Sequence, residues 1–102
     1  MIARVWRGRT TSANAEPYLA HLRGDTLPGL RGLDGYAGGY VLRRDGDGGV
    51  DFFVITFWTS TDSIRAFAGD DQEAAVIPEE AQRLLAAFDD RADHYTVAID
   101  DR

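Results

Sequence analysis

The fold is decided by VDFFVITFWT, residues 50–59, in which nearly every side chain is apolar. Successive side chains of a β-strand point to opposite faces, so the pattern predicts a strand with two apolar faces. One face carries Phe53, Ile55 and Phe57, and the other carries Phe52, Val54 and Trp58, with Thr56 as its polar member. Both faces of this strand therefore need to be covered.

The chain before this strand contains two further predicted strands and a helix. Residues 1–9 and 36–44 contain β-branched and aromatic residues, which favours strands. Residues 13–24 follow a Thr-Thr-Ser cluster that offers capping hydroxyls, so they are predicted to form a helix. The glycine-dense residues 24–35 are predicted to form a loop, and the DGDGG of residues 45–49 a hairpin turn.

The chain after the strand contains two predicted helices and a last strand. Residues 60–68 open with capping residues and end before Gly69, as helices commonly do. Residues 78–88 begin with Pro and two Glu, which suits the first turn of a helix. Residues 94–99, HYTVAI, are predicted to form the last strand.

This order of elements predicts one domain over residues 1–102, of the α+β class. The expected architecture is a ferredoxin-like split βαβ, with a four-stranded antiparallel sheet and its helices on one face. Helices on one face satisfy only one side of residues 50–58, and an exposed apolar patch usually marks an interface. We therefore expect a homodimer that packs sheet to sheet through a two-fold axis.

Composition excludes several classes of function. The net charge of -6 argues against nucleic acid as a partner, and the scattered Arg residues argue against a membrane surface. The chain has neither Cys nor Lys, which excludes thiolate and lysine Schiff-base chemistry. Two distant His and carboxylates concentrated in turns form no recognisable metal site. No signal peptide or membrane helix is evident, so a cytoplasmic protein is expected.

Three residues are candidates for proton transfer. His94 and His21 are the default proton acceptors, because imidazole has an ordinary pKa near neutrality. Tyr40 lies in the middle of a predicted strand, where a buried hydroxyl would need a partner and could serve a substrate as donor. Each of the three also has a structural interpretation, as an exposed or half-buried side chain.

Larger side chains are candidates for contact with a substrate. Trp58 and Trp6 lie in strands, where tryptophan either lines a pocket or anchors the core. Tyr18 lies on the apolar stripe of the helix predicted over residues 13–24, and Phe67 on that of the helix predicted over residues 60–68. The cations of Arg7 and Arg43 either bind an anionic oxygen or extend into solvent.

Several stretches together resemble a known family. IARVWRGR near the start, YVLRRDGDGG, FFVITFWTSTDSIRAFAGDD and the closing HYTV are similar to antibiotic biosynthesis monooxygenase-type domains of the dimeric α+β barrel superfamily. The resemblance covers nearly the whole chain, and Trp58 matches the tryptophan that follows the third strand in the oxygenases. The chain has no counterpart of their asparagine, since its only Asn is Asn14, and no His in residues 62–88, where haem-degrading members carry one.

The resemblance implies a pocket between the sheet and the helices that holds a polycyclic phenol or anthrone. In the members without cofactors, the ionised substrate itself reduces dioxygen, so neither metal nor flavin is needed. The leading hypothesis is a cofactor-independent monooxygenase acting on a small apolar aromatic substrate. A cyclase or isomerase on the same scaffold and a non-catalytic dimeric binding protein are the alternatives.

Overall fold

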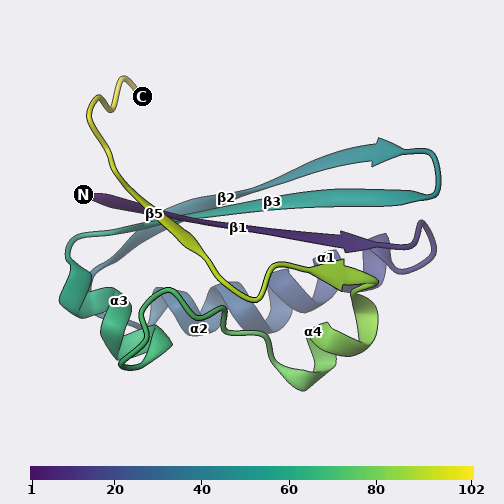
Figure 1. Ribbon diagram of the computed structural model, residues 1–102, viewed down its shortest axis with the longest axis horizontal. Helices are drawn as coiled ribbons and strands as arrows, with labels where there is room; N and C mark the ends of the chain where they lie inside the picture. Colours follow the sequence, from purple (N-terminus) through teal and green to yellow (C-terminus); the bar gives the residue numbers. More distant parts are fainter.

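The computed structural model describes all of residues 1–102 as a sheet with helices on one face (Figure 1). The elements in chain order are β1 (Ile2–Thr10), α1 (Ala15–His21), the π-helical turn η1 (Leu22–Thr26), α2 (Leu27–Arg31), β2 (Tyr36–Gly46), β3 (Gly49–Trp58), α3 (Thr61–Ala68), α4 (Glu79–Leu84), β4 (Ala87–Phe88) and β5 (Asp93–Thr96). The strand order is β2-β3-β1, with β4 and β5 both on the far side of β1. Every pairing is antiparallel, which confirms the predicted ferredoxin-like α+β fold.

The two faces of β3 differ sharply in burial. Phe52 and Trp58 face the helices and are almost fully buried, at 1% and 0% exposure. Phe53, Ile55 and Phe57 point to the other face and are only half-buried. No helix lies over that second face, which we call the open face (Figure 1).

The buried residues beneath the helices form two separate clusters. The larger is centred on Tyr18 and Phe52, whose rings meet edge to face at 5.0 Å. The smaller contains Leu30, Trp58 and Ile64. Trp58 stacks on Phe67 with 5.5 Å between ring centroids. The helix-covered core is therefore divided along the length of the sheet.

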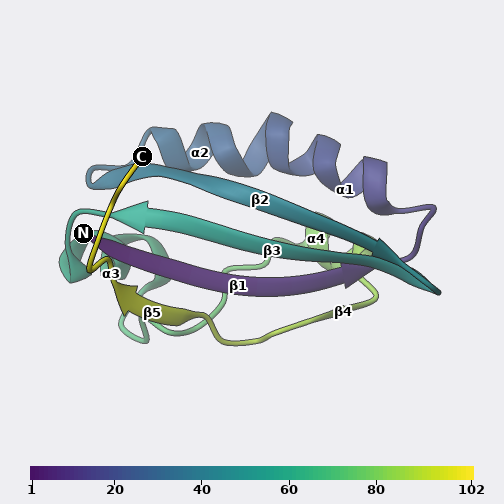
Figure 2. The same cartoon turned by 90° about the horizontal axis from the view of Figure 1, so that it is seen from above.

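The loop predicted for residues 24–35 is wrong over most of its length. α1, η1 and α2 form one continuous helical run, which lies along the β2 side of the sheet (Figure 2). The π-helical turn directly precedes the turn that holds Pro28, whose ring lacks an amide hydrogen and crowds the preceding turn. Burial of Leu22 and Leu30 outweighs the poor helix propensity of Gly24 and Gly29.

The predicted helix over residues 78–88 is also too long, since α4 ends at Leu84. Phe88 belongs to β4, which was not expected, and the last strand expected over residues 94–99 is β5, which ends at Thr96. β4 and β5 both pair with β1 and are interrupted between them, so the sheet has five strands in place of four. The interruption has a clear cause in the backbone bonding. Residues 90–92 leave the sheet and bond to residues 73–75, through Ala75 N–H to Asp90 O at 3.0 Å and Ala92 N–H to Glu73 O at 2.7 Å.

Other predicted features are confirmed. Ser60 caps α3 and accepts a hydrogen bond from the Ser63 amide at 3.2 Å. Gly35 ends the loop before β2 with a φ of 86°, and a Cβ there would lie 1.9 Å from the Ser63 hydroxyl oxygen. That close approach explains why the loop ends on glycine. None of the helices has the length and apolar character that crossing a bilayer requires.

Candidate functional site

A cavity of about 80 Å³ lies between the helix-covered face of the sheet and the helices. It separates the two core clusters, because Tyr18 of the larger and Leu30 of the smaller both contribute to its wall. Ten of its 14 lining residues are apolar, including Trp6 from β1 and Phe67 from α3. The wall of the cavity is therefore mainly apolar.

Three hydroxyl groups lie in this apolar wall, those of Tyr18, Thr26 and Thr56. Tyr18 is 2% exposed, and its hydroxyl makes no hydrogen bond within the protein. Burial raises the pKa of Tyr18 to about 12, so the hydroxyl stays protonated and can donate. The Thr56 hydroxyl accepts a bond from the Trp58 indole at 2.9 Å, which leaves its own hydrogen free to donate.

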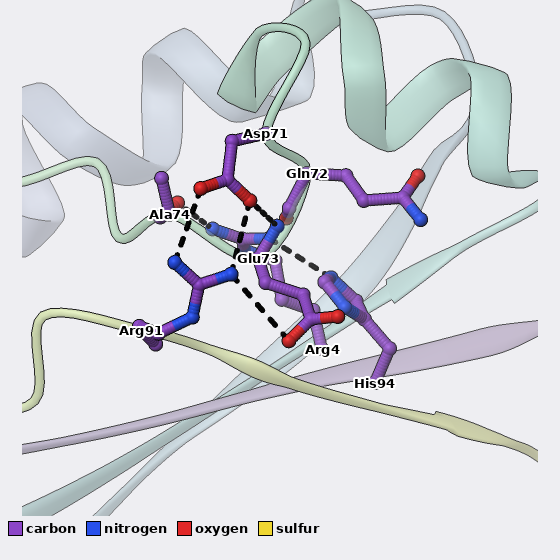
Figure 3. A network of polar contacts seen from close by, with 7 residues as sticks. All are labelled: Arg4, Asp71, Gln72, Glu73, Ala74, Arg91 and His94. Atoms are coloured by element: carbon purple, nitrogen blue, oxygen red, sulfur yellow. Dashed lines mark hydrogen bonds and ion pairs between the residues drawn. The ribbon is translucent and has the colours of Figure 1, made fainter.

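Arg4 supplies the one charged side chain of the cavity wall. It lies on β1 between Ile2 and Trp6, it is 5% exposed, and its guanidinium lies over the Phe67 ring, 5.7 Å from the centroid. The guanidinium donates to Gln72 O, to Ala74 O at 2.7 Å, and to His94 Nε2 at 2.9 Å (Figure 3). Three of its five N–H groups are thus used, and two have no acceptor in the protein.

No carboxylate balances the charge of Arg4. The nearby acidic side chains pair with Arg91, whose guanidinium lies 3.0 Å from Asp71 and 3.6 Å from Glu73 (Figure 3). Burial lowers the pKa of Arg4, but an arginine starts from so high a value that it stays charged at neutral pH. The cavity wall therefore carries a buried positive charge satisfied only by neutral groups.

His94 supports Arg4 in one particular protonation state. Because a guanidinium can only donate, the contact with Arg4 requires Nε2 of His94 to accept, which places the ring proton on Nδ1. Partial burial and then the charge of Arg4 lower the pKa of His94, against the opposing effect of Glu73 and Asp93. His94 is thus neutral at pH 7, with Nε2 already occupied.

Residues 72–78 form a segment whose second half, residues 75–78, is part of the cavity wall. They form no regular helix or strand, and Ala75, Val76, Ile77 and Pro78 all line the cavity. The segment is held at one end by the bonds from Arg4 and at the other by Gln82 Nε2 donating to Ile77 O at 2.9 Å. The Arg4 side chain therefore both lines the cavity and holds the segment that forms part of its wall.

The structure brings three of the predicted site residues together in the cavity: Trp6, Tyr18 and Phe67. Trp58 lies behind the wall, fully buried between Phe67 and Tyr36, and reaches the cavity only through its bond to Thr56. His94 lies behind Arg4. His21 lies beside the cavity, where its Nε2 is 3.3 Å from the hydroxyl of the lining residue Thr26.

The other three predicted residues lie outside the cavity. Tyr40 is 46% exposed on the open face, where it meets the Phe57 ring. Arg7 lies on the same face, stacked over the Phe53 ring at 5.0 Å. Arg43 forms ion pairs with Glu16 and Asp45 at the surface, which corresponds to the solvated interpretation.

Arg4, Thr26 and Thr56 are polar wall residues that were not among the site residues predicted from the sequence. A signal for Arg4 was present, because it shares the strand parity of Ile2 and Trp6 and so lies on a face expected to be apolar. A long cation at such a position either extends outward or is retained for binding. Thr56 gave a similar signal, because it is the polar residue on the strand face that also carries Phe52, Val54 and Trp58.

The fold and the cavity define a ferredoxin-like α+β protein with an apolar site between sheet and helices. Neither protein-family models nor curated proteins give a match to the sequence. Among solved structures, the chain is similar to a putative antibiotic biosynthesis monooxygenase from Bacillus cereus, with a TM-score of 0.69 and 12% identity over 100% of this chain and 95% of that one. The resemblance predicted from the sequence is confirmed at the level of the fold.

A second group of similar structures binds porphyrins. The haem degrader MhuD from Mycobacterium tuberculosis, with two haems in its active site, matches with a TM-score of 0.61 and 18% identity over 98% of both chains. A mutant of MhuD with two manganese protoporphyrin IX molecules per active site matches with a TM-score of 0.57 and 19% identity, over 98% of this chain and 97% of that one.

The residues of this chain do not fit a haem. No imidazole lines the cavity to serve as axial ligand, since His94 Nε2 is bonded to Arg4 and His21 lies outside the wall. No group of three or more His, Asp or Glu side chains is placed to hold a metal ion.

Proposed function

We propose that the protein is a cofactor-independent monooxygenase that oxidises an apolar aromatic compound, such as a polyketide-type phenol or anthrone, with dioxygen. The observation that carries the proposal is an apolar cavity whose wall also holds the unpaired Tyr18 hydroxyl and the Arg4 cation. Apolar walls exclude water from a reactive intermediate, and fixed donors stabilise an oxygen anion as it develops. The fold shared with a putative antibiotic biosynthesis monooxygenase supports the proposed oxygenase function.

The reaction needs no group beyond the substrate and dioxygen. The ionised aromatic ring gives one electron to dioxygen, and the two radicals join through a new carbon–oxygen bond to form a peroxide on the ring carbon. The outer peroxide oxygen takes up a proton from solvent in place of the one lost when the substrate ionised. The remaining hydrogen on that carbon then leaves as a proton, which breaks the oxygen–oxygen bond, and the departing hydroxide takes up that proton. One oxygen atom stays as a carbonyl and the other leaves as water, so a methylene group and dioxygen become a carbonyl group and water. Tyr18 would donate to the oxygen that gains charge.

Entry of the substrate requires the cavity to widen. A volume of about 80 Å³ is too small for an aromatic ring, so part of the wall must move. Residues 75–78 are the part best suited to it, because they lack regular structure and Val76 is 45% exposed. We propose that this segment shifts outward when the ring enters.

The open face is the proposed dimer interface. Half-buried Phe53, Ile55 and Phe57 lie there beside Leu42 and Tyr95, which are 48% and 57% exposed. A second copy related by a two-fold axis would cover this apolar surface and close two sheets into an α+β barrel. The cavity lies on the opposite side of the sheet, so dimer formation would leave it accessible.

Oxygen consumption tests the proposal. Addition of anthrone to the purified protein should cause oxygen uptake with formation of anthraquinone, measured with an oxygen electrode and by absorbance. Tyr18→Phe should slow the reaction by about 10²-fold, as loss of one such donor does in other enzymes. Tyr95→Phe, on the open face, is the matched control and should react at the wild-type rate.

Two results would contradict the proposal. If related phenols and anthrones are bound but consume no oxygen, the protein is a binding protein. If the protein instead converts them under strictly anaerobic conditions, by ring closure or by exchange of a ring proton, the cyclase or isomerase alternative replaces the oxygenase.

A further inference from the structure

The cavity contains a strong cation but no group that can remove a proton. Its wall includes no carboxylate and no imidazole, and the hydroxyls of Tyr18, Thr26 and Thr56 are poor bases. The two histidines, the natural acceptors near pH 7, lie outside the wall. A substrate that must ionise to react cannot therefore pass its proton to a side chain beside it.

Arg4 offers another way to obtain the anion. It is 5% exposed, it has no carboxylate partner, and two of its N–H groups are not bonded within the protein. An opposite charge within about 4–6 Å lowers the pKa of an acid by roughly 1–3 units, more strongly where water is excluded. An ordinary phenol, with a pKa near 10, would be brought to roughly 7–9, so a phenol that is already more acidic than this is the kind that becomes largely ionised at neutral pH beside such a guanidinium.

We propose that Arg4, in place of a general base, causes the substrate to ionise. The ligand of this cavity is an acidic aromatic hydroxyl compound, which binds as its phenolate against the free N–H groups of Arg4. The proton is released to solvent as the phenol binds. This ionisation does not require any reaction with dioxygen. The inference rests on the proposed function only for the cavity and the aromatic class of the ligand.

The geometry also explains the apolar remainder of the wall. A phenolate has one charged oxygen and a flat apolar ring, which matches one cation set among Trp6, Phe67 and Val54. The Phe67 ring already lies under the guanidinium, so a bound ring would join an existing aromatic contact. The ligand charge would neutralise the one buried cation of the core, whose isolation is otherwise costly.

Anaerobic titration of 4-nitrophenol tests this inference, because its ionised form absorbs in the visible and no oxygen chemistry can interfere. In the presence of saturating protein, the midpoint of ionisation should fall by at least one pH unit, so that the phenolate binds at least tenfold more tightly than the phenol. The uncharged methyl ether, 4-nitroanisole, should bind at least tenfold more weakly than the phenolate.

Variants assign the effect to Arg4. Arg4→Gln should abolish the shift in midpoint, whereas Arg4→Lys, which keeps a charge without the planar fork, should retain part of it. Arg7→Gln removes a guanidinium from the same strand but from the open face, and should leave the shift intact. Circular dichroism establishes that each variant is folded. If Arg4→Gln does not fold, the comparison of 4-nitrophenol with 4-nitroanisole on the wild-type protein still tests whether the cavity prefers the phenolate.

The inference is overturned if bound 4-nitrophenol ionises at the same pH as the free compound, or if Arg7→Gln rather than Arg4→Gln removes the shift. These outcomes are separate from failure of the oxygenase. A shifted midpoint without oxygen uptake would leave the anion site standing and refute the proposed reaction. Oxygen uptake with an unshifted midpoint would support the proposed reaction and refute the anion site at Arg4.

Discussion

Arg4 occupies a position where strand alternation normally places an apolar side chain. It is stabilised by dipoles rather than by a counter-charge: two backbone carbonyls and one imidazole accept its hydrogen bonds. Such groups satisfy a guanidinium without neutralising it, which keeps the positive charge available to a ligand. The same bonds fix residues 72–74, so the charge and the wall of the cavity are built together.

The state of His94 makes this arrangement depend on pH. Because the folded protein lowers the pKa of His94, the unfolded chain binds its proton at a higher pH than the folded chain does. The free energy of unfolding should therefore fall as the pH drops through the ordinary histidine range near 6.5, and level off below the lowered folded pKa. Denaturant unfolding between pH 7.5 and 5 measures this loss.

His94→Gln should flatten the dependence in that window, since an amide does not titrate there. His21→Gln, which removes the other histidine, is the matched control and should keep the wild-type profile. The carboxyls of Asp45, Asp71 and Asp100 do not confuse the result, because their arginine partners lower their pKa values and move their effect to more acidic pH. A wild-type profile that is flat from pH 7.5 to 5 would refute the role given to His94.

At the scale of elements, β3 was predictable because alternation and composition agreed along its whole length. The hairpin with β2 and the start of α3 followed from residues that act locally, such as Gly48 at a φ of 81° and Ser60 as a cap. Where local chemistry dictates the conformation, the sequence alone was sufficient.

Two elements were not predictable in this way, because their conformation depends on contacts made far along the chain. Gly24, Pro28 and Gly29 are typical of a loop, yet the packing of Leu22 and Leu30 on the sheet keeps the chain helical. The pairing with β1 is interrupted between β4 and β5 because residues 90–92 bond to residues 73–75, a partner that no local pattern identifies.

The site was predictable in part for the same reason. Aromatic residues on the inner stripes of helices and strands, such as Trp6, Tyr18 and Phe67, line the cavity because that side is apolar. Tyr40 has the wrong strand parity and lies on the open face. Arg4 was overlooked because charged residues are usually solvated, and only its three acceptors, distant in sequence, make its burial possible.

At the scale of the molecule, the sheet separates two surfaces with different expected roles. One face encloses the cavity, and the other presents an apolar surface crossed by the C-terminal residues, where Arg102 lies 4.8 Å from the centroid of the Phe57 ring. We expect sedimentation at micromolar concentration to give a dimer. Phe53→Glu, which places a charge at the centre of the open face, should give a folded monomer.

The matched control for that experiment is Ala20→Glu, an exposed position on α1 on the helix side. It adds the same charge and should leave the dimer unchanged. A wild-type protein that sediments as a well-folded monomer would refute the dimer, and with it the explanation given for the apolar open face.

The central claim is that the cavity between sheet and helices binds an aromatic anion through Arg4. A crystal structure of the protein soaked with 4-bromophenol tests it most directly, because the anomalous signal of bromine locates the ring without ambiguity. We predict a bromine peak inside the cavity, with the phenol oxygen within hydrogen-bond distance of Arg4 and residues 75–78 displaced outward. A bromine peak only on the open face beside Arg7, with the cavity unchanged, would contradict the claim.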